Sequence, residues 1–264
     1  MKKIIKALLP NNITNTYRAL RDQKQKKRNE KVFAGNAVTC PICNATYSLF
    51  GPYGVSKREN ARCHNCGSLE RDRLIYLFLQ EKVVFFNNID TPVRVLHFAP
   101  EKPFYDLFTN MENVDYTPCD LFPEVYPYKG KTKITKVDIT QIPFEDNSFD
   151  FVLCNHVLEH VIDDRKAMRE LHRVLNKNGN GIFQVPIDYK RETTYEDFSI
   201  TSPKAREKAF GQDDHVRWYG KDYVLRLQET GFKVNEDRFI TTFNKDDLFK
   251  YGLSSTELIY HCKK

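Results

Sequence analysis

A largely apolar run, Phe149–Cys154, lies near the middle of this 264-residue chain and constrains its fold more than any other feature. Such a run is typical of a strand buried on both faces of a parallel sheet. It ends in Asn155 and His156, which places polar side chains at the edge where open α/β sheets bind ligands. A short alternating run that ends at Val137 predicts a neighbouring strand, and Asp138 follows it as a carboxylate. The stretch therefore predicts an α/β fold with a mostly parallel sheet.

The whole stretch from Asp138 to His160 resembles class I S-adenosylmethionine-dependent methyltransferases. In that superfamily, an Asp and a following hydrophobic residue hold the adenine after the third strand, as Asp138 and Ile139 would here. A phrase that ends in Leu-Glu-His carries the fourth strand and the next helix. The resemblance implies a Rossmann-like, seven-stranded, mostly parallel sheet with an antiparallel last strand, and S-adenosylmethionine as cofactor. The alternative is two adjacent strands of any Rossmann-like domain.

The first strand of this domain begins at Val93 and leads into the turn His97-Phe-Ala-Pro-Glu101. Methyltransferases of this class usually have a glycine-rich turn here, because the backbone must approach the methionine part of the cofactor closely. This turn contains no glycine, and Ala99 is its only small residue. The resemblance nevertheless assigns His97, Ala99 and Glu101 to the cofactor site.

A second carboxylate, Asp120, ends the next predicted strand and lies 21 residues beyond Ala99. This separation is close to the roughly 20 residues at which an acidic residue meets the ribose hydroxyls in nucleotide-binding βαβ units. A carboxylate can accept hydrogen bonds from both hydroxyls. We therefore predict that Asp120, Asp138 and Asn155 contact the cofactor.

Two C-x2-C pairs, Cys40/Cys43 and Cys63/Cys66, are separated by nineteen residues. Pairs at this spacing indicate a structural zinc site in which four thiolates leave no open position. A disulfide framework and a redox C-x-x-C are the alternatives, disfavoured by a cytoplasmic setting and by the two matched pairs. With the sequence from Cys66 to Arg73, the chain resembles zinc-ribbon methyltransferases that are often associated with polysaccharide biosynthesis.

The positive charge of the chain is concentrated at one end. The net charge is +6, but residues 1–31 hold ten Lys and Arg against two acidic residues, so the remainder is close to neutral. Such a tail either attracts nucleic acid or anionic lipid or is simply a solvated segment. No apolar run reaches the ~18 residues that suggest a membrane span, and the start of the chain is too short for a secretory signal, so we expect a cytoplasmic protein.

A long charged and aromatic segment, residues 187–219, shows no clear periodicity and is predicted to be a lid. Its end concentrates Asp214, His215, Arg217, Trp218 and Tyr219. Trp218 suits stacking and Arg217 suits binding an anionic group, so Asp214, Arg217, Trp218 and Tyr219 are candidate substrate contacts. The alternative is a structural turn in which the Trp is buried and the Arg pairs with Asp214.

Three histidines are candidates for a general base or for orienting the acceptor: His156, His160 and His215. His156 follows the fourth strand, and His160 lies one helical turn further on. The domain boundaries that we predict are a basic, partly helical tail (1–35), a zinc ribbon (36–68), a bridging helix (69–90) and a methyltransferase domain (91–264).

The most specific functional hypothesis is methyl transfer from S-adenosylmethionine to a small polar acceptor, such as a hydroxyl of a sugar or glycan precursor. Two alternatives stay open. One is a nucleic-acid or protein methyltransferase that holds its polymer with the ribbon and the basic tail. The other is a zinc-stabilised interaction module whose glycine-free turn no longer admits the cofactor.

Overall fold

The structure, a computed structural model, describes residues 24–25, 28–29, 31–54, 57–83, 92–128 and 130–264. Most of the predicted basic tail, 1–35, therefore lies outside the described residues. The chain divides into two units: unit 1 (residues 1–79, 126–129 and 240–256) and unit 2 (residues 80–125, 130–239 and 257–264).

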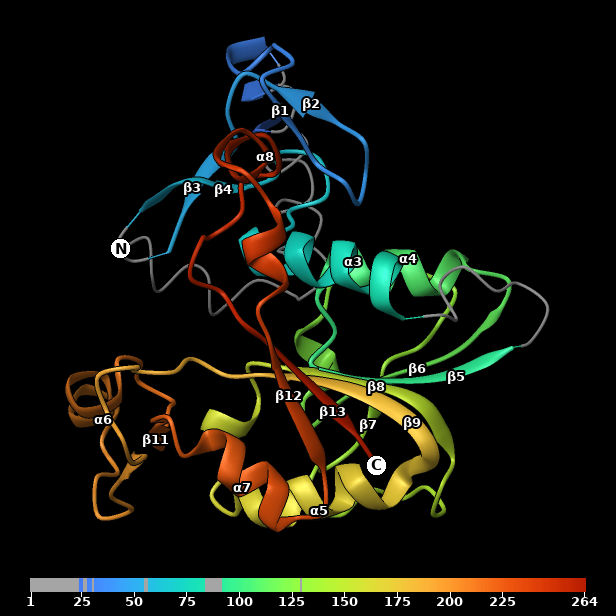
Figure 1. The fold of residues 1–264 in the computed structure, drawn as a ribbon, viewed down its shortest axis with the longest axis vertical. Coiled ribbons are helices and arrows are strands. Elements are labelled where there is room, and N and C mark those ends of the chain that lie inside the picture. The colour runs from blue at the N-terminus through green and yellow to red at the C-terminus, as the bar shows by residue number, and fades with distance from the viewer. Residues whose placement is uncertain (1–23, 26–27, 30, 55–56, 84–91, 129) are drawn as a thin grey trace, which may run out of the picture. The chain divides into compact units, whose positions relative to one another are not determined.

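Unit 2 contains a seven-stranded sheet with the strand order β12-β13-β9-β8-β5-β6-β7 (Figure 1). All neighbouring pairs from β9 to β7 are parallel, whereas β13 is antiparallel to both of its neighbours. This confirms the predicted mostly parallel sheet with an antiparallel last strand. The strands are β5 (Val93–Phe98), β6 (Val114–Asp120), β7 (Thr135–Lys136), β8 (Phe149–Asn155), β9 (Leu175–Gln184), β12 (Lys233–Asp237) and β13 (Ile259–Lys263).

Helices cover both faces of this sheet: α4 (Lys102–Asn110) lies on one face, and α5 (Asp164–Val174) and α7 (Tyr223–Glu229) lie on the other (Figure 1). Strand β8 runs through the middle, and its residues 151–154 are fully buried, as the apolar run predicts. The side chain of Asp163 accepts a hydrogen bond from the backbone N–H of Lys166 and so begins α5. The strand ends that carry polar residues are therefore attached to a buried core.

The predicted lid, 187–219, has more regular structure than its sequence suggests. Strand β10 (Tyr195–Glu196) pairs with β11 (Arg217–Trp218) in an antiparallel hairpin, and α6 (Pro203–Phe210) lies between them in the chain. Ser202 caps α6, and Gly211 ends it in the left-handed conformation. The lack of a clear periodicity in this part of the sequence therefore does not mean that it lacks regular structure. Short 3-10 turns complete unit 2: η2 (Pro123–Val125), η3 (Leu158–His160) and the start of η4 (Phe239–Thr242).

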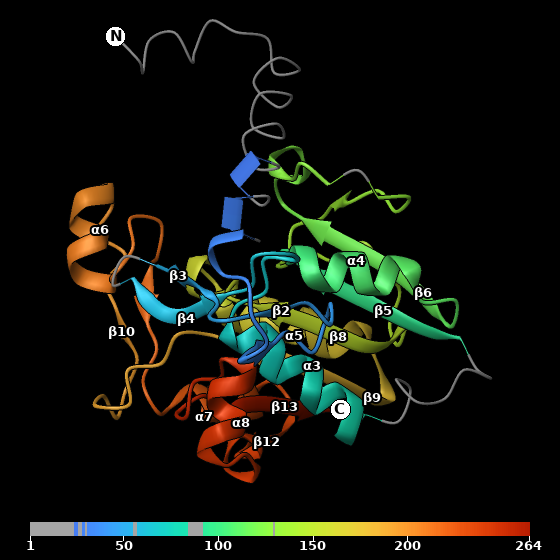
Figure 2. The same ribbon diagram turned by 90° about the horizontal axis from the view of Figure 1, so that it is seen from above.

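In the part of the chain that the structure describes, unit 1 includes two small hairpins, the first part of one helix and a second short helix. Its elements are β1 (Val38–Thr39) paired with β2 (Thr46–Tyr47), β3 (Gly51–Tyr53) paired with β4 (Arg58–Arg62), the first part of α3 (Glu70–Lys82), and α8 (Lys245–Tyr251). The division between the units falls inside α3, after Leu79. Helix α8 comes from the connection between β12 and β13, so unit 1 is assembled from segments far apart in the sequence (Figure 2).

Arg73 joins these distant segments of unit 1. Its guanidinium is fully buried, stacks on the Phe50 ring at 4.4 Å, and donates hydrogen bonds to four backbone carbonyls. Two carbonyls belong to the cysteine-bearing segment and two lie at the carboxyl end of α8: Ser68 (2.7 Å), Ala61 (2.9 Å), Tyr251 (2.5 Å) and Gly252 (2.6 Å). Since buried carbonyls need donors, one side chain satisfies several groups that the local chain leaves unpaired.

Replacing Arg73 should therefore destabilise unit 1 strongly. We expect Arg73→Met to lower the free energy of unfolding by about 3–5 kcal/mol, because several buried carbonyls lose their donor at once. Urea unfolding followed by circular dichroism measures this. Arg58→Met is the matched control: Arg58 is half-exposed in its ion pair with Glu70, so its loss should cost at most about 1 kcal/mol. Equal effects of the two substitutions would contradict the role of Arg73.

Candidate functional site

Residues that the sequence analysis assigns to the cofactor lie at the carboxyl ends of three neighbouring strands of unit 2. Strands β5, β6 and β8 run parallel and side by side, so their carboxyl ends meet at one edge of the sheet. Ala99 follows β5, Asp120 is the last residue of β6, and Asn155 is the last residue of β8. The fold therefore brings together three of the residues that the sequence assigns to the cofactor.

The turn after β5 has the backbone shape that a glycine would normally provide. Ala99 has a φ of 49°, in the left-handed region, and its backbone N–H donates to the Cys119 carbonyl at 3.0 Å. Alanine is strained in this region, and glycine is not. The turn thus keeps its tight course although its sequence contains no glycine.

His97 does not face this edge as a cofactor ligand would. Its side chain is fully buried, with Nδ1 2.9 Å from the Tyr116 hydroxyl and Nε2 2.8 Å from a carboxylate oxygen of Glu101. The prediction that His97 contacts the cofactor is therefore corrected: both ring nitrogens are engaged inside the protein. Its observable role is to orient Glu101, which remains partly exposed in the turn.

Two carboxylates at this edge are ordered by the turns that follow them. Asp120 accepts a hydrogen bond from the Phe122 backbone N–H at 2.7 Å. Asp138 accepts from both the backbone N–H and the hydroxyl of Thr140, each at 2.8 Å. Both carboxylates stay accessible to solvent, whereas Ile139 is buried. The turns fix the two acceptor groups in place before any ligand arrives.

Asn155 carries an unusual unsatisfied group. Its side chain is only 2% exposed, and within the described residues neither its amide nitrogen nor its amide oxygen has a hydrogen-bond partner. A buried amide without partners costs free energy, so this position is suited to a ligand that both donates and accepts. Together with the two carboxylates, these donors and acceptors fit a nucleoside cofactor with ribose hydroxyls and an amino-acid part.

The three histidines predicted as catalytic candidates lie around one residue that the sequence analysis missed, Glu159. Glu159 is 1% exposed, and one of its oxygens lies 3.2 Å from Nδ1 of His156. The rings of His160 and His215 meet edge to face with their centroids 4.8 Å apart. The i, i+3 spacing of His156 and Glu159 was the available signal, since side chains three residues apart can meet at a turn.

This cluster holds a buried negative charge beside a neutral histidine. Burial alone would raise the pKa of Glu159, but the hydrogen bond from His156 and the charges of the neighbouring histidines bring it below its ordinary value. Burial lowers the pKa of His215. At neutral pH, Glu159 is therefore an ionised carboxylate, and His215 is an uncharged imidazole.

Two of the predicted substrate contacts, Arg217 and Tyr219, belong to the core instead. Arg217 is 1% exposed, pairs with Glu196 at 2.9 Å and Asp164 at 3.6 Å, and donates to three carbonyls of the loop 158–162. Tyr219 is fully buried and donates to Asp164 at 2.8 Å. Neither side chain is available to a substrate, so their assignment as substrate contacts is wrong. The alternative pairing of Arg217 with Asp214 is wrong too, because its carboxylate partners come from β10 and α5.

The other two predicted contacts are accessible. Asp214 is exposed, and its carboxylate and its carbonyl both lie 3.4 Å from Nδ1 of His160. Trp218 is half-buried in the hairpin opposite Tyr195. Only Asp214 of the predicted substrate group thus adjoins the histidine cluster.

Comparison with known proteins identifies the sheet-bearing part of the chain. Residues 106–183 match the family model described as "Methyltransferase domain". This part of unit 2 is similar to a methyltransferase domain. The match covers less than half of the chain.

Two curated relatives and one solved structure are similar to this chain. An uncharacterised protein of Methanocaldococcus jannaschii is 39% identical over 75 residues, which are 28% of this chain and 33% of the relative. The ubiquinone/menaquinone biosynthesis C-methyltransferase UbiE of Klebsiella pneumoniae is 26% identical over 117 residues, 39% of this chain and 47% of the relative. The chain thus spans a third to a half of these relatives. The structure of the cyclase SpnF covers 82% of this chain and 87% of its own, with a TM-score of 0.48 and 16% identity.

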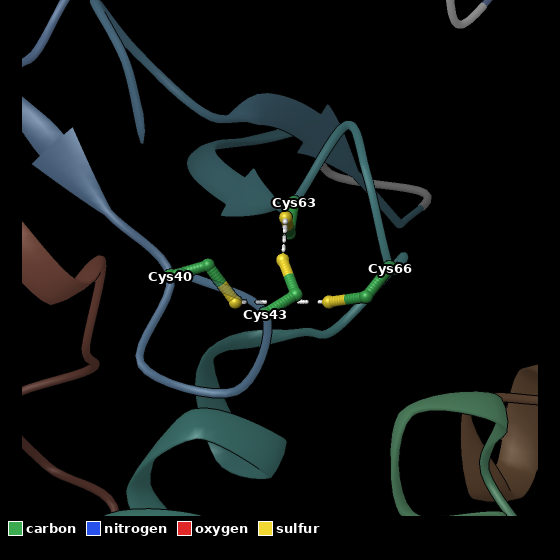
Figure 3. A group of neighbouring side chains, drawn as sticks. All are labelled: Cys40, Cys43, Cys63 and Cys66. Carbon is green, nitrogen blue, oxygen red and sulfur yellow. Dashed lines mark hydrogen bonds between the residues drawn. The ribbon is translucent and has the colours of Figure 1, made fainter. Parts of the chain in front are cut away.

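Unit 1 brings the four paired cysteines together. The sulfurs of Cys40 and Cys66 are 3.6 Å apart, and those of Cys43 and Cys63 are 3.7 Å apart. All four sulfurs lie within 4.8 Å of one another and point toward a common centre (Figure 3). Four sulfurs bound at about 2.3 Å around one zinc ion would be roughly 3.8 Å apart. The thiols therefore fit a tetrahedral zinc site.

The pKa values of the four neighbouring thiols differ from one another. Hydrogen bonding from Cys40 holds the pKa of Cys43 well below its ordinary value, whereas the same crowding raises the pKa of Cys66. The buried hydroxyl of Ser68 lies 3.3 Å from the sulfurs of both Cys40 and Cys66. The three remaining cysteines, Cys119, Cys154 and Cys262, are fully buried in unit 2. No helix in the described ranges is both long and apolar enough to cross a bilayer.

The ion-pair network that holds the β10–β11 hairpin of unit 2 should respond to acid. Burial would raise the pKa of Glu196, but hydrogen bonds from Arg226 and Arg217 bring it below its ordinary value of 4.5. A lowered pKa in the folded state contributes stability that is complete above pH 4.5 and is lost as the pH falls through the folded pKa. We expect Glu196→Gln to lower the free energy of unfolding by about 1–3 kcal/mol at pH 7 and by progressively less in acid.

The measurement is urea unfolding monitored by Trp218 fluorescence between pH 7 and pH 3. Glu207→Gln on the exposed side of α6 is the control, and it should follow the wild type throughout. A constant difference between Glu196→Gln and wild type across this pH range would contradict the linkage.

Proposed function

We propose that the protein is a class I S-adenosylmethionine-dependent methyltransferase. The observation that carries the proposal is the pair of ordered, accessible carboxylates, Asp120 and Asp138, at the carboxyl edge of a sheet that matches a methyltransferase domain. The left-handed turn at Ala99 counts against the alternative of a non-catalytic module, because the turn keeps its shape without glycine. The alternative that uses the basic tail rests on residues outside the described ones.

Each residue at this edge would contact a different part of the cofactor. Asp120 accepts hydrogen bonds from the ribose hydroxyls, and Asp138 with Ile139 holds the adenine. The turn at Ala99 lets the backbone approach the methionine part, where the unsatisfied amide of Asn155 supplies a donor and an acceptor. The bound cofactor supplies an activated methyl group, and alignment of an acceptor atom with that group accounts for most of the acceleration.

For the acceptor we propose a hydroxyl of a small polar molecule, such as a sugar or a glycan precursor. A hydroxyl needs a base within hydrogen-bond reach, and His156 and His160 are the accessible histidines at this edge, with side chains 28% and 34% exposed. Asp214 lies next to His160 and is free to accept hydrogen bonds from a polyol. This arrangement supports a polar acceptor and does not require contacts from Arg217 and Tyr219, which are buried.

In unit 1 we propose that Cys40, Cys43, Cys63 and Cys66 hold a structural zinc ion. The sulfur separations and the inward direction of all four side chains support this assignment (Figure 3). A closed four-thiolate site has no open position for chemistry, so its effect would be on stability.

Binding of the cofactor is the direct test of the proposed enzyme. A ligand at 100 times its dissociation constant stabilises the folded state by about 2.7 kcal/mol, which should raise the melting midpoint of a domain of this size by roughly 5–10 °C. We expect this shift with S-adenosylmethionine and with its demethylated product in differential scanning fluorimetry. Asp120→Asn and Asp138→Ala should reduce it strongly.

Asp115→Asn is the matched control for this measurement. Asp115 is an exposed carboxylate on β6, the same strand that ends in Asp120, but it lies at the strand's other end. It should keep the full shift. The proposal fails if the wild type shows no shift, or if all three substitutions leave the shift unchanged.

Zinc content tests the ribbon independently of the cofactor. We expect Cys43→Ser to contain about one zinc ion per chain less than the wild type, measured by inductively coupled plasma mass spectrometry. Because metal binding contributes directly to folding of such small units, Cys43→Ser should also melt earlier. Cys119→Ala, which removes a buried thiol of unit 2, should retain the zinc. Equal zinc content in the two variants would refute the four-cysteine assignment.

A further inference from the structure

A second candidate metal centre lies in unit 2, apart from the four cysteines. Among the described residues, the ligand atoms of Glu159, His160 and His215 all lie within 4.8 Å of one another. Two residues belong to η3 and the third comes from the segment before β11, 55 residues later. We propose that these three side chains bind one divalent first-row transition-metal ion, and that His156 and Asp214 hold the ligands in position.

The unsatisfied atoms of the cluster point to a missing ligand. Within the described residues, one oxygen of Glu159 and Nε2 of His215 are buried and have no hydrogen-bond partner. The two residues are only 1% and 3% exposed. Burying an anionic carboxylate oxygen and an imidazole lone pair without partners is costly, and a bound cation removes the cost for both.

Each ligand is held by its other polar atom, as metal ligands usually are. Nδ1 of His215 donates to the Phe210 carbonyl at 3.1 Å, which leaves the lone pair on Nε2. Nδ1 of His160 lies 3.4 Å from a carboxylate oxygen of Asp214, and the second oxygen of Glu159 lies 3.2 Å from His156. Because carbonyl and carboxylate oxygens only accept hydrogen bonds, these contacts place the proton on Nδ1 of each histidine and leave the lone pair of Nε2 for a metal ion.

The chemistry of the group favours a transition metal. It consists of one carboxylate and two imidazoles, and imidazole suits zinc, iron and related ions better than magnesium or calcium. Ligand atoms bound at about 2.1 Å to one ion are at most roughly 4.2 Å apart. Side-chain adjustments of about half an ångström therefore suffice to close the site around an ion.

Three protein ligands leave coordination positions open for a further oxygen. A hydroxyl-bearing ligand could occupy them, and the acceptor suggested above is of this class; this extension rests on the proposed function. The site differs in this respect from the closed cluster of four thiols, and its role would be binding and orientation rather than stability.

Manganese(II) provides a selective probe, because thiolates are poor ligands for it and the four-cysteine site should not take it up. The full-length protein, with zinc in its ribbon, is titrated with Mn²⁺ while electron paramagnetic resonance follows the free ion. We expect one Mn²⁺ per wild-type chain. Glu159→Gln, His160→Gln and His215→Gln should each weaken binding at least tenfold, and Asp214→Asn should weaken it less.

His172→Gln is the control, since His172 is a half-buried histidine of the same unit that packs on Phe232. It should bind Mn²⁺ as the wild type does. His160 is partly exposed, so its variant should fold even if a substitution at the buried Glu159 does not. The proposal is overturned if the wild type binds neither Mn²⁺ nor a zinc ion beyond the one in its ribbon, or if His160→Gln and His215→Gln fold and bind the metal normally.

The same samples separate this inference from the proposed function. Thermal shifts with S-adenosylmethionine report the cofactor site, and Mn²⁺ binding reports the cluster. Mn²⁺ bound by the wild type without any cofactor shift would support the metal site and refute the methyltransferase. The reverse result would support the cofactor site and refute the metal site.

Discussion

One buried guanidinium, that of Arg217, determines the geometry of the histidine cluster. It donates to three carbonyls of the loop 158–162 and forms an ion pair with Glu196 of the hairpin, so the loop and the hairpin are fixed to each other. His215 lies two residues before Arg217, and it is therefore held beside His160 of that loop. A charge buried this deeply is stable only because acidic partners and carbonyls surround it. The cluster thus depends on a group that does not touch a ligand.

The cofactor edge depends on a different constraint, the parallel pairing of β5, β6 and β8. Parallel strands deliver their carboxyl ends to one edge, so residues far apart in the chain become neighbours there. Ala99, Asp120 and Asn155 reach that edge through backbone hydrogen bonding alone. Their side chains can then serve a ligand, because the core beneath them already supplies the stability.

Much of this organisation is predictable because its signals are local. The cysteine spacing brings four thiols together, the apolar run gives β8, and Asp163 begins a helix by capping it. The substrate group was predicted less well. Arg217 and Tyr219 look like ligand-binding residues by type, but their partners, such as Asp164, lie more than fifty residues away. No local pattern shows whether such a charge is paired inside the core.

The sequence by itself determined the strand that organises the sheet, the four-cysteine group and the carboxylates at strand ends, because each follows from residue type and short spacing. Only the tertiary structure decided which polar groups are buried and which of them lack partners. Glu159 shows the difference: in the sequence it is an ordinary acidic residue, and in the fold it is a buried anion beside His160 and His215. Burial and charge pairing depend on contacts between distant segments, and those exist only once the chain has folded.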